Sequence, residues 1–580
     1  MMKRLVPMLA AAGSGLALAL ALPLVIQPIS LRQLDPAGWL ELLAWVALVP
    51  AFLALRTAPT GWAAFRRGLV AGLAFFFAAI HWVSHAMTAF GGLPLWLSIV
   101  ALTLLVLYMA VHWAVAFAAS WTIRARLGWP LVVHLPFVWT ALELSRNYLF
   151  SGFPWGNLGY TQVRTLPVAQ LAALGGVYAI AALVAAVNAV IADAVADVRA
   201  GRSLPRRSLV AVGLLLALTV GHGVWRLGVV RARVAAAPAL SVGIVQPNVD
   251  QGRKNKARDN RAYILSRLVP PTLEADRAGA DLVVWPEAAY PIYLAPGLMS
   301  LDLPGAELPR LSRAHLLMGA VTLESVVGDD GKRMRRVGNV NLMLTPELDV
   351  LGVYQKNHLV PFGEYVPLHR WLPWLGQVVP SMAPSAPGRE LRVLEFEPKA
   401  SAGELPAPTA TATPIPAAAA SPAPSRVRLA PMICFDAIFP EINLAFAAKE
   451  PEPELLVNTT NDAWYGYSSG PYQFLAIVRL RAIEAGKAVV RSAYAGVSAV
   501  ILPTGEVAPG AIEVGPVDPE LAPDPPEPPG LLLAQVPRLR GRTPYTRVGD
   551  LFALASAAFA AAAVAAAWRA GRRGPPAARG

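Results

Sequence analysis

The sequence predicts a multi-span α-helical membrane domain joined to a soluble domain in which strands alternate with helices. Three observations predict it: the composition, a series of long apolar stretches in the first 230 residues, and an interval from 238 to 540 without any. Of the 580 residues, 55% are hydrophobic and 15% are charged, whereas soluble proteins carry about 25% charged residues. This composition excludes an ordinary cytosolic enzyme and a disordered protein.

The apolar stretches predict eight spanning helices, since a span needs about 20 mostly apolar residues. Seven form a membrane domain over residues 1–230, and the eighth is a C-terminal helix. They cover residues 6–26, 37–55, 67–89, 93–120, 130–149, 167–194, 208–226 and 547–568. The first begins like a signal peptide, with Lys3 and Arg4 before an Ala-rich run. We expect it to stay as an anchor, because its apolar run exceeds the roughly 7–15 residues of a signal core.

The distribution of Lys and Arg predicts the orientation, because cytoplasmic loops are enriched in them. With the N-terminus inside, the outside short loops carry little beyond Arg32 and Arg164. The inside segments carry Lys3, Arg4, Arg56, Arg66, Arg67, Arg124, Arg126, Arg199, Arg202, Arg206, Arg207, Arg569, Arg572, Arg573 and Arg579. This pattern puts residues 227–546 on the outer face. Much of the net charge of +13 lies in these short loops, so no nucleic-acid partner is expected.

The soluble domain is predicted over residues 238–515. A helix is expected near 257–280, interrupted at Pro270 and Pro271, and a second at 471–487. The expected strands lie at 240–249, 281–287, 315–322, 339–356 (a hairpin), 427–436, 454–462 and 488–507. This alternation of strands and helices is typical of an α/β or α+β fold with a buried sheet.

Two segments rich in proline are expected outside the core of that domain. Residues 400–426 are Pro/Ala/Thr-rich without apolar periodicity, which predicts a flexible insert. Residues 516–546 are expected to be a Pro-rich linker back to the C-terminal membrane helix at 547–568.

Three chemically active side chains each end a different predicted strand. Glu287 ends VVWPE, Lys356 ends GVYQK, and Cys434 ends APMIC; Glu364 lies eight residues after the lysine. Taken singly, each has an ordinary explanation, as a solvated carboxylate, a rim charge or a small buried thiol. Strand ends converge at one edge of a sheet, however, where ligand sites of α/β proteins lie.

Together these groups suit nucleophilic catalysis. A thiol with a pKa of about 8.5 needs a base or a positive field to become a thiolate near neutrality, and Glu287 and Lys356 supply one of each. Cys434 is the only cysteine, so it forms no intrachain disulfide and builds no thiolate zinc site alone. The scattered histidines show no metal-ligand spacing, and neither a cofactor nor a metal is expected.

The motifs around these residues resemble those of the nitrilase, or carbon-nitrogen hydrolase, superfamily, with its Glu-Lys-Cys triad. They are WPE at 285–287, YQKNHLVPFGEYVP at 354–367, and ICFD at 433–436 followed by NTTNDAWYG at 458–466. With the spans on both sides, the chain resembles the apolipoprotein N-acyltransferase family. Further similar motifs are LELSRNYLFSGFPWGNLGYTQ at 142–162, VQPNVDQGRK at 245–254 and GPYQFLAIVRLRAIEAGK at 470–487.

The resemblance implies a fold, a reaction and a location. The soluble domain would be a nitrilase-like four-layer αββα sandwich on the periplasmic face of the bacterial inner membrane. The enzyme would take an acyl chain from a phospholipid, commonly phosphatidylethanolamine, through a thioester in a ping-pong reaction. The acceptor would be the amine of diacylglyceryl-cysteine of an apolipoprotein, in the last step of lipoprotein maturation.

The resemblance also implies roles for single residues. Cys434 would be the nucleophile, Glu287 the general base and Lys356 the oxyanion stabiliser, with Glu364 and Asp436 in support. The chain departs from the family where Phe435 and Asp436 stand in place of the frequent Tyr-Glu pair, and where Asn255 stands in place of a frequent tryptophan. Both departures concern substrate contacts more than the triad.

Two other functions are alternatives to acyl transfer. A membrane-tethered nitrilase-type amidase would share the triad but needs one span, not eight. A transporter or receptor with an inactive domain is disfavoured by the intact Glu287, Lys356 and Cys434. Within the membrane block, Glu143 and Arg146 share a helix face; we favour a packing role over a functional one.

Overall fold

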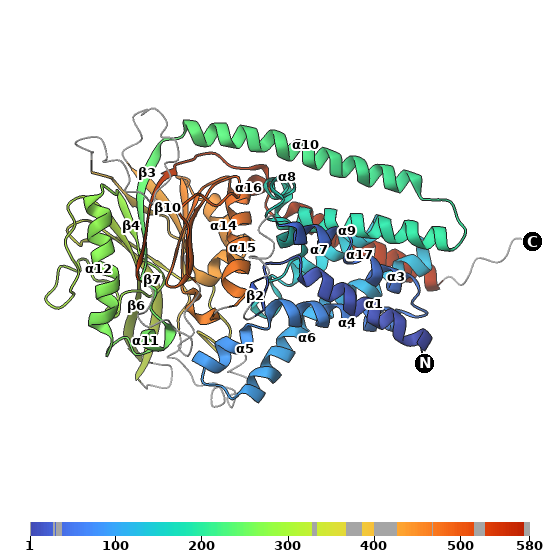
Figure 1. The fold of residues 1–580 in the computed structure, drawn as a ribbon, viewed down its shortest axis with the longest axis horizontal. Coiled ribbons are helices and arrows are strands. Elements are labelled where there is room, and N and C mark those ends of the chain that lie inside the picture. Colours follow the sequence, from blue (N-terminus) through green and yellow to red (C-terminus); the bar gives the residue numbers. More distant parts are fainter. Residues whose placement is uncertain are drawn as a thin grey trace, which may run out of the picture. The chain divides into compact units, whose positions relative to one another are not determined.

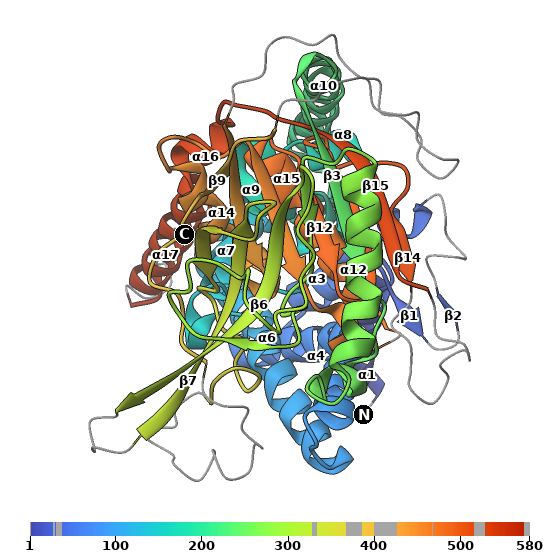
Figure 2. The same cartoon turned by 90° about the vertical axis from the view of Figure 1, so that its left-hand side faces the viewer.

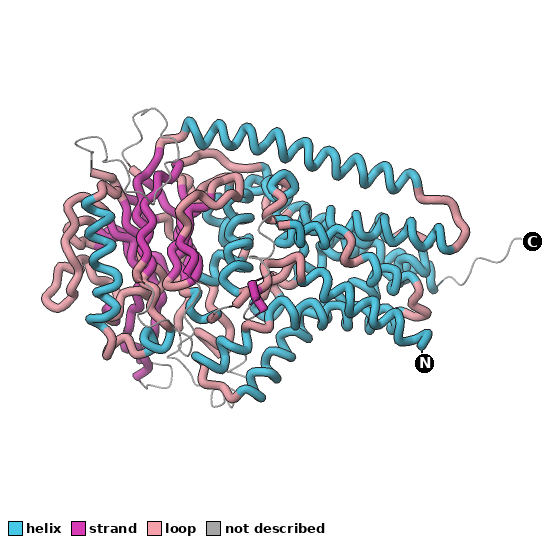
Figure 3. Tube along the Cα trace, in the orientation of Figure 1, coloured by secondary structure: helices cyan, strands magenta, loops and turns pink. Residues whose placement is uncertain are grey.

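The structure is a computed structural model that describes residues 2–26, 29–30, 38–327, 333–366, 385–399, 426–466, 468–514 and 528–572. It divides into two compact units. The helical unit comprises Met1–Ser84, Trp96–Leu227 and Arg547–Gly580, and the sheet unit comprises His85–Leu95 and Gly228–Thr546. Figure 3 shows that the long strands belong to the sheet unit. The expected insert at 400–426 lies outside the described residues except for Arg426.

Six described helical segments are long and apolar enough to cross a membrane. They are Trp39–Arg56, Gly61–Ile80 (α4), Leu95–Leu127 (α6), Ala172–Arg199 (α9), Arg206–Ala236 (α10) and Leu551–Arg572 (α17). Two apolar helices are shorter: the part of α1 (Met2–Ala19) from Leu5, and α7 (Leu131–Ser145). Each of the eight expected spans overlaps one of these segments (Figure 1).

The expected span at 37–55 is not one regular helix. It is a 3-10 helix, η1 (Trp39–Trp45), followed by α3 (Val49–Arg56). Asn188 of α9 satisfies the backbone at this break: its side chain accepts from Leu48 N at 2.9 Å and donates to Ala44 O at 2.8 Å. A buried amide therefore replaces the missing helical hydrogen bonds.

Small residues allow the helices of this unit to approach closely. A Cβ at Gly68 of α4 would lie 2.7 Å from the carbonyl oxygen of Trp113, and one at Gly72 would lie 2.9 Å from Ala110 Cα, both on α6. Glycine at these positions lets the two backbones touch, as is usual where helices associate in lipid.

Glu143 and Arg146, at the end of α7, fix the chain that follows them. The Glu143 carboxylate accepts from Leu158 N at 2.7 Å and from Trp139 Nε1 at 3.1 Å. Arg146 lies 3.8 Å from that carboxylate and donates to the Asn157 side chain. Both side chains are buried, and these contacts agree with the packing role.

The sheet unit contains two sheets packed face to face. One has the order β14-β13-β12-β11-β10-β9 and the other β15-β3-β4-β6-β7-β8, with β5 beside β6. The first sheet is built from β9 (Leu394–Phe396), β10 (Val427–Ile433), β11 (Leu455–Thr460), β12 (Val489–Ala493), β13 (Gly496–Ile501) and β14 (Ile512–Val514). The second is built from β3 (Ala239–Gln246), β4 (Leu282–Val284), β5 (Tyr293–Leu294), β6 (His315–Val327), β7 (Arg333–Leu344), β8 (Val350–Gln355) and β15 (Gly530–Pro537).

Helices cover the outer faces of both sheets. Helix α12 (Arg261–Arg277) packs on β3, β4 and β15, and α15 (Gly470–Ala485) packs on β13 and on α14 (Pro440–Ala447). In between, β12 contacts β3 and β10 contacts β7. The unit is thus the expected four-layer αββα sandwich (Figure 1).

Three elements differ from expectation. Part of the expected linker at 516–546 forms β15, which pairs antiparallel with the whole of β3, Gly530 opposite Gln246 and Pro537 opposite Ala239. Helix α12 continues through Pro270 and Pro271 instead of being interrupted. The strand expected at 315–322 extends to Val327 and pairs with β7 in a ribbon that runs beyond the rest of the sheet (Figure 2).

Candidate active site

The three candidate catalytic residues follow the carboxyl ends of β4, β8 and β10. Strand β4 is parallel to β3 and β6, and β10 is parallel to β11, so these ends meet where the two sheets face each other. Trp285, directly after β4, donates from its indole to the Thr272 hydroxyl of α12 at 2.8 Å. That contact fixes the segment that presents Glu287.

Lys356 lies between two carboxylates. Its Nζ is 3.1 Å from Glu287 Oε1 and 3.0 Å from Glu364 Oε1. Asn339 of β7 donates to the same Glu287 oxygen at 2.7 Å, and Glu364 Oε2 accepts from Val360 N at 2.8 Å. The lysine and Glu287 are buried, so this is a hydrogen-bonded charge cluster shielded from water.

Cys434 has a left-handed backbone, with φ of 46°, which few non-glycine residues adopt. It begins a short 3-10 helix, η5 (Cys434–Ile438), directly after β10. A sharp turn from strand to helix places the thiol at the tip of the bend. Strain of this kind persists only when surrounding contacts hold it.

Asp436 supplies those contacts. Its carboxylate accepts from Ile433 N at 3.1 Å, from His358 N at 2.8 Å and from the Tyr354 hydroxyl at 2.8 Å. It therefore ties the turn that carries Cys434 to β8 and to the segment after Lys356. Asp436 makes these three hydrogen bonds although aspartate is one methylene shorter than the glutamate frequent in the family, and although Phe435 replaces the frequent tyrosine.

The electrostatics of the cluster favour an ionised Glu287 beside a protonated Cys434 thiol. Burial raises the pKa of the Cys434 thiol to about 12, and the charge of Glu287 adds to this. Burial would also raise the pKa of Glu287, but the ammonium groups of Lys356 and Lys254 hold it below its ordinary value. Burial opposes the charge of Lys356, yet the carboxylates of Glu287 and Glu364 raise its pKa well above the ordinary value.

Sequence reasoning did not single out two residues of this site. Asn339 lies inside a strand and carries no pattern of its own. Lys254, the last residue of the VQPNVDQGRK motif, donates to the Glu287 carbonyl oxygen at 2.9 Å and lies 3.8 Å from the centre of the Tyr494 ring. The motif was the available signal for Lys254.

A buried ion pair supports the neighbouring strands. Arg491 of β12 lies 2.7 Å from Asp462 and donates to the Asn458 side chain. Asp462 also accepts from the Thr460 hydroxyl at 3.0 Å, and a Thr460 hydrogen bond favours the ionised form of Cys434. No group of three or more His, Cys, Asp or Glu side chains able to hold a metal occurs among the described residues.

Two family models match the chain. Residues 14–190 match the apolipoprotein N-acyltransferase N-terminal domain, and residues 241–515 match the carbon-nitrogen hydrolase domain. An apolipoprotein N-acyltransferase from Geobacter metallireducens is 33% identical over 94% of each chain. The chain belongs to the apolipoprotein N-acyltransferase family.

A further relative carries the same family name. An apolipoprotein N-acyltransferase from Caulobacter vibrioides is 30% identical over 85% of this chain and 83% of its own. Among solved structures, an amidase from Nesterenkonia sp. AN1 is 17% identical, with a TM-score of 0.31, over 54% of this chain and 98% of its own. Family membership indicates lipoprotein and phospholipid substrates in general, and a membrane location.

Proposed function

We propose that this chain transfers an acyl chain from a phospholipid to the N-terminal amine of diacylglyceryl-cysteine on an apolipoprotein. The reaction passes through a thioester on Cys434, in two half-reactions that share one site. The observation that carries this proposal is the Lys356 ammonium held between Glu287 and Glu364, next to a cysteine on a strained turn.

In the first half-reaction, Glu287 takes the thiol proton and Cys434 Sγ attacks the ester carbonyl carbon of the phospholipid. Because the thiol pKa is raised to about 12, the thiolate forms only as its proton leaves for the carboxylate. Lys356 stabilises the tetrahedral oxyanion. The carbon–oxygen bond then breaks, Glu287 returns its proton to the leaving oxygen, and lysophospholipid departs.

In the second half-reaction, the neutral α-amine of the acceptor attacks the thioester carbonyl. Glu287 accepts the proton that the amine loses, the carbon–sulfur bond breaks, and that proton returns to the departing sulfur. The product is an amide, and the free thiol is regenerated. A thioester suits this step, since sulfur, protonated by Glu287 as it departs, leaves more readily than the oxygen of an ester, and an amine is a strong nucleophile.

Acyl transfer needs water kept away from the thioester. Glu287 and Lys356 are buried, and Cys434 is 8% exposed. The apolar helices anchor the chain in the membrane, where both lipid substrates reside. We propose phosphatidylethanolamine as the donor, as the family resemblance implies. The distribution of Lys and Arg in the short loops supports placing the sheet unit on the periplasmic face.

The test is transfer by the full chain, in detergent, from phosphatidylethanolamine to a diacylglyceryl-cysteine peptide. Wild type should form an acyl adduct on Cys434 that mass spectrometry detects and that the peptide discharges as amide. Cys434→Ala should do neither, while unfolding at the same temperature. Hydrolysis of small amides without lipid adduct would instead support the tethered amidase.

A further inference from the structure

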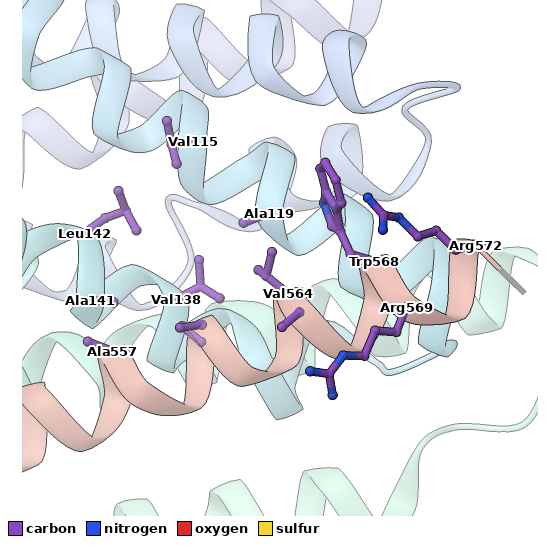
Figure 4. Close-up of a pocket in the computed structure, with 13 residues that line it drawn as sticks. Val115, Ala119, Val138, Ala141, Leu142, Ala557, Val564, Trp568, Arg569 and Arg572 are labelled. Atoms are coloured by element: carbon purple, nitrogen blue, oxygen red, sulfur yellow. The ribbon is translucent and has the colours of Figure 1, made fainter.

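The helical unit contains an apolar groove with arginines at one end. The groove, of about 730 Å³, lies between α6, α7 and α17. Apart from two arginines, its lining is hydrophobic and rich in alanine, as with Val138, Ala557 and Val564 (Figure 4). A volume of roughly 300–1,000 Å³ is typical of ligand sites.

The charged end lies at the last two turns of α17. Arg569 and Arg572 line the groove there, beside Trp568 (Figure 4). Arg126 of α6 is also near, because a Cβ added at Gly571 would lie 3.0 Å from its guanidinium carbon. None of the three arginines forms an ion pair within the described residues, where Asp193 and Asp197 pair instead with Arg56 and Arg202.

We propose that this groove is a binding site for an anionic diacyl phospholipid of the membrane, separate from the acyl donor in the active site. Guanidinium groups bind phosphate in a planar, bidentate way. Basic pockets between spanning helices recognise anionic headgroups, and the indole of Trp568 suits the interface between headgroup and acyl chains. The apolar lining takes an acyl chain where small side chains leave room for it.

A lipid without a cleavable ester separates this site from catalysis. The full chain, stripped of lipid in detergent, is mixed with equal amounts of ether-linked phosphatidylglycerol and phosphatidylethanolamine, and native mass spectrometry counts the bound molecules. Wild type should retain phosphatidylglycerol in preference. The Arg569→Gln/Arg572→Gln variant should retain it roughly 30-fold less, since each arginine contributes about 1 kcal/mol and 1.4 kcal/mol is tenfold.

Two further variants make the result specific. Arg206→Gln/Arg207→Gln, which removes two exposed arginines at the start of α10, should retain phosphatidylglycerol like wild type. Ala561→Phe, which fills the groove, should reduce retention of the lipid. Equal retention of both lipids by wild type, or unchanged retention in the Arg569→Gln/Arg572→Gln variant, would overturn the proposal, as would a second copy of the chain in place of lipid.

A second inference concerns Lys254 and rests on the proposed function. Lys254 lies on α11 (Gln251–Asn255), whose first turn is capped by Asp250, accepting from Arg253 N at 2.8 Å. Its Nζ donates to the Glu287 carbonyl oxygen at 2.9 Å and lies over the Tyr494 ring. With its amide turned so that the oxygen faces the lysine, Asn461 accepts at 3.0 Å.

These three partners follow three different strands, β4, β11 and β12. The Lys254 ammonium therefore fixes the backbone of Glu287, the residue whose carboxylate binds Lys356 and Asn339. Backbone position matters at this point, since the next residue, Ala288, has φ of 48°. Lys254 also adds a second positive charge, besides that of Lys356, near the Glu287 carboxylate.

We infer that Lys254 is a positioning residue for the general base: it holds the backbone of Glu287 and keeps its carboxylate ionised. The groups whose charges act with it are Glu287, Cys434 and Lys356. Burial lowers the pKa of Lys254 to about 7, while the charge of Glu287 acts in the opposite direction. Lys254 is therefore fully charged on the acidic side of neutrality. As pH rises it loses its proton, and its electrostatic support of the Glu287 carboxylate weakens.

The pH profile distinguishes this role from a structural one. Lys254→Met should raise the pKa of Glu287, so that the acidic limb of the kcat/KM profile moves to higher pH. Lys254→Arg keeps the charge and should leave the limb near its wild-type position, although the rate falls. Lys256→Met, an exposed lysine two residues away, is the matched control and should behave like wild type.

The rate of Cys434 alkylation by iodoacetamide, measured against pH, gives the same information without any acyl transfer. If wild type transfers no acyl chain, the proposed function fails, while the alkylation profile still tests Lys254. If Lys254→Met alkylates and turns over with the wild-type pH profile, the role of Lys254 is wrong.

Discussion

Replacing Lys356 with methionine tests the charge cluster most directly. The change leaves the carboxylates of Glu287 and Glu364 facing the space where the ammonium was, within 3.1 Å and 3.0 Å of it. Removing one partner of a buried ion pair costs about 3–5 kcal/mol, because the remaining charge is uncompensated. For a unit of this size we expect the unfolding temperature to fall by roughly 4–7 °C.

The loss should depend on pH with a defined sign. In the wild type the pKa of Glu287 is held below its ordinary value, so its stabilising effect is present above the unfolded pKa and is lost as pH falls through the folded one. Without Lys356, only Lys254 remains to counter the effect of burial, so the pKa of Glu287 rises. The deficit of the variant should therefore be largest near pH 8 and shrink toward pH 5.

Thermal unfolding in detergent, followed by tryptophan fluorescence from pH 5 to 8, measures this effect. Lys356→Met/Glu287→Gln should regain part of the lost stability, because one of the two carboxylate charges left without the lysine is removed, yet stay inactive. The control is Lys399→Met, which breaks a pair with Glu347 at 2.8 Å whose side chains are both about half exposed; it should cost less than about 1 kcal/mol. A deficit in Lys356→Met that matched the control, or that did not change with pH, would refute the reasoning.

Five further outcomes are expected. Cys434→Ala should abolish the acyl adduct and transfer with an unchanged unfolding temperature, and Cys434→Ser should be severely impaired, as mass spectrometry and a transfer assay can show. Glu287→Gln should slow acylation on the order of 100-fold or more, measured in a single turnover; wild-type turnover would exclude it as the base. Asp436→Ala leaves three hydrogen-bond donors without their acceptor, namely Ile433 N, His358 N and the Tyr354 hydroxyl. It should therefore lower stability by about 3 kcal/mol or more, measured by thermal unfolding. Shortening 400–426 to a few Gly/Ser residues should leave stability and transfer near wild type, since doubling a flexible loop costs only about 0.6 kcal/mol; a changed thioester lifetime would contradict this. A reporter fused after Gly580 should behave as cytoplasmic, whereas periplasmic activity would mean that one span was miscounted.

The sequence predicted the strands of the sheet unit well where a short apolar run stops at a chemically distinct residue. Glu287, Lys356 and Cys434 were placed at strand ends on that basis, and the structure brings them together. The order of the strands and the contact between Lys356 and Glu364 depend on long-range pairing, which local pattern does not encode. Asn339 shows this most clearly, because only the fold brings its side chain within hydrogen-bond distance of Glu287.

The wrong expectations have physical explanations. The sequence does not predict strand β15, because the proline-rich segment before it is typical of a linker and its own apolar run is short. Helix α12 was expected to break at Pro270 and Pro271 because proline removes helical hydrogen bonds. Burial against β3 and β4 offsets that loss, and the Thr272 hydroxyl bonds both Leu268 O at 2.7 Å and the Trp285 indole.

The pairing of β15 with β3 has a consequence for the order in which the chain folds. The two strands are joined over eight residue pairs, but nearly the whole sheet unit separates them in sequence. While the ribosome synthesises that interval, one long edge of β3 has no partner, and unpaired edges promote wrong association. The sandwich can be completed only after Pro537 has emerged, just before α17 enters the membrane. Contacts so distant in sequence form slowly, so the last membrane helix is synthesised while the sheet is still closing.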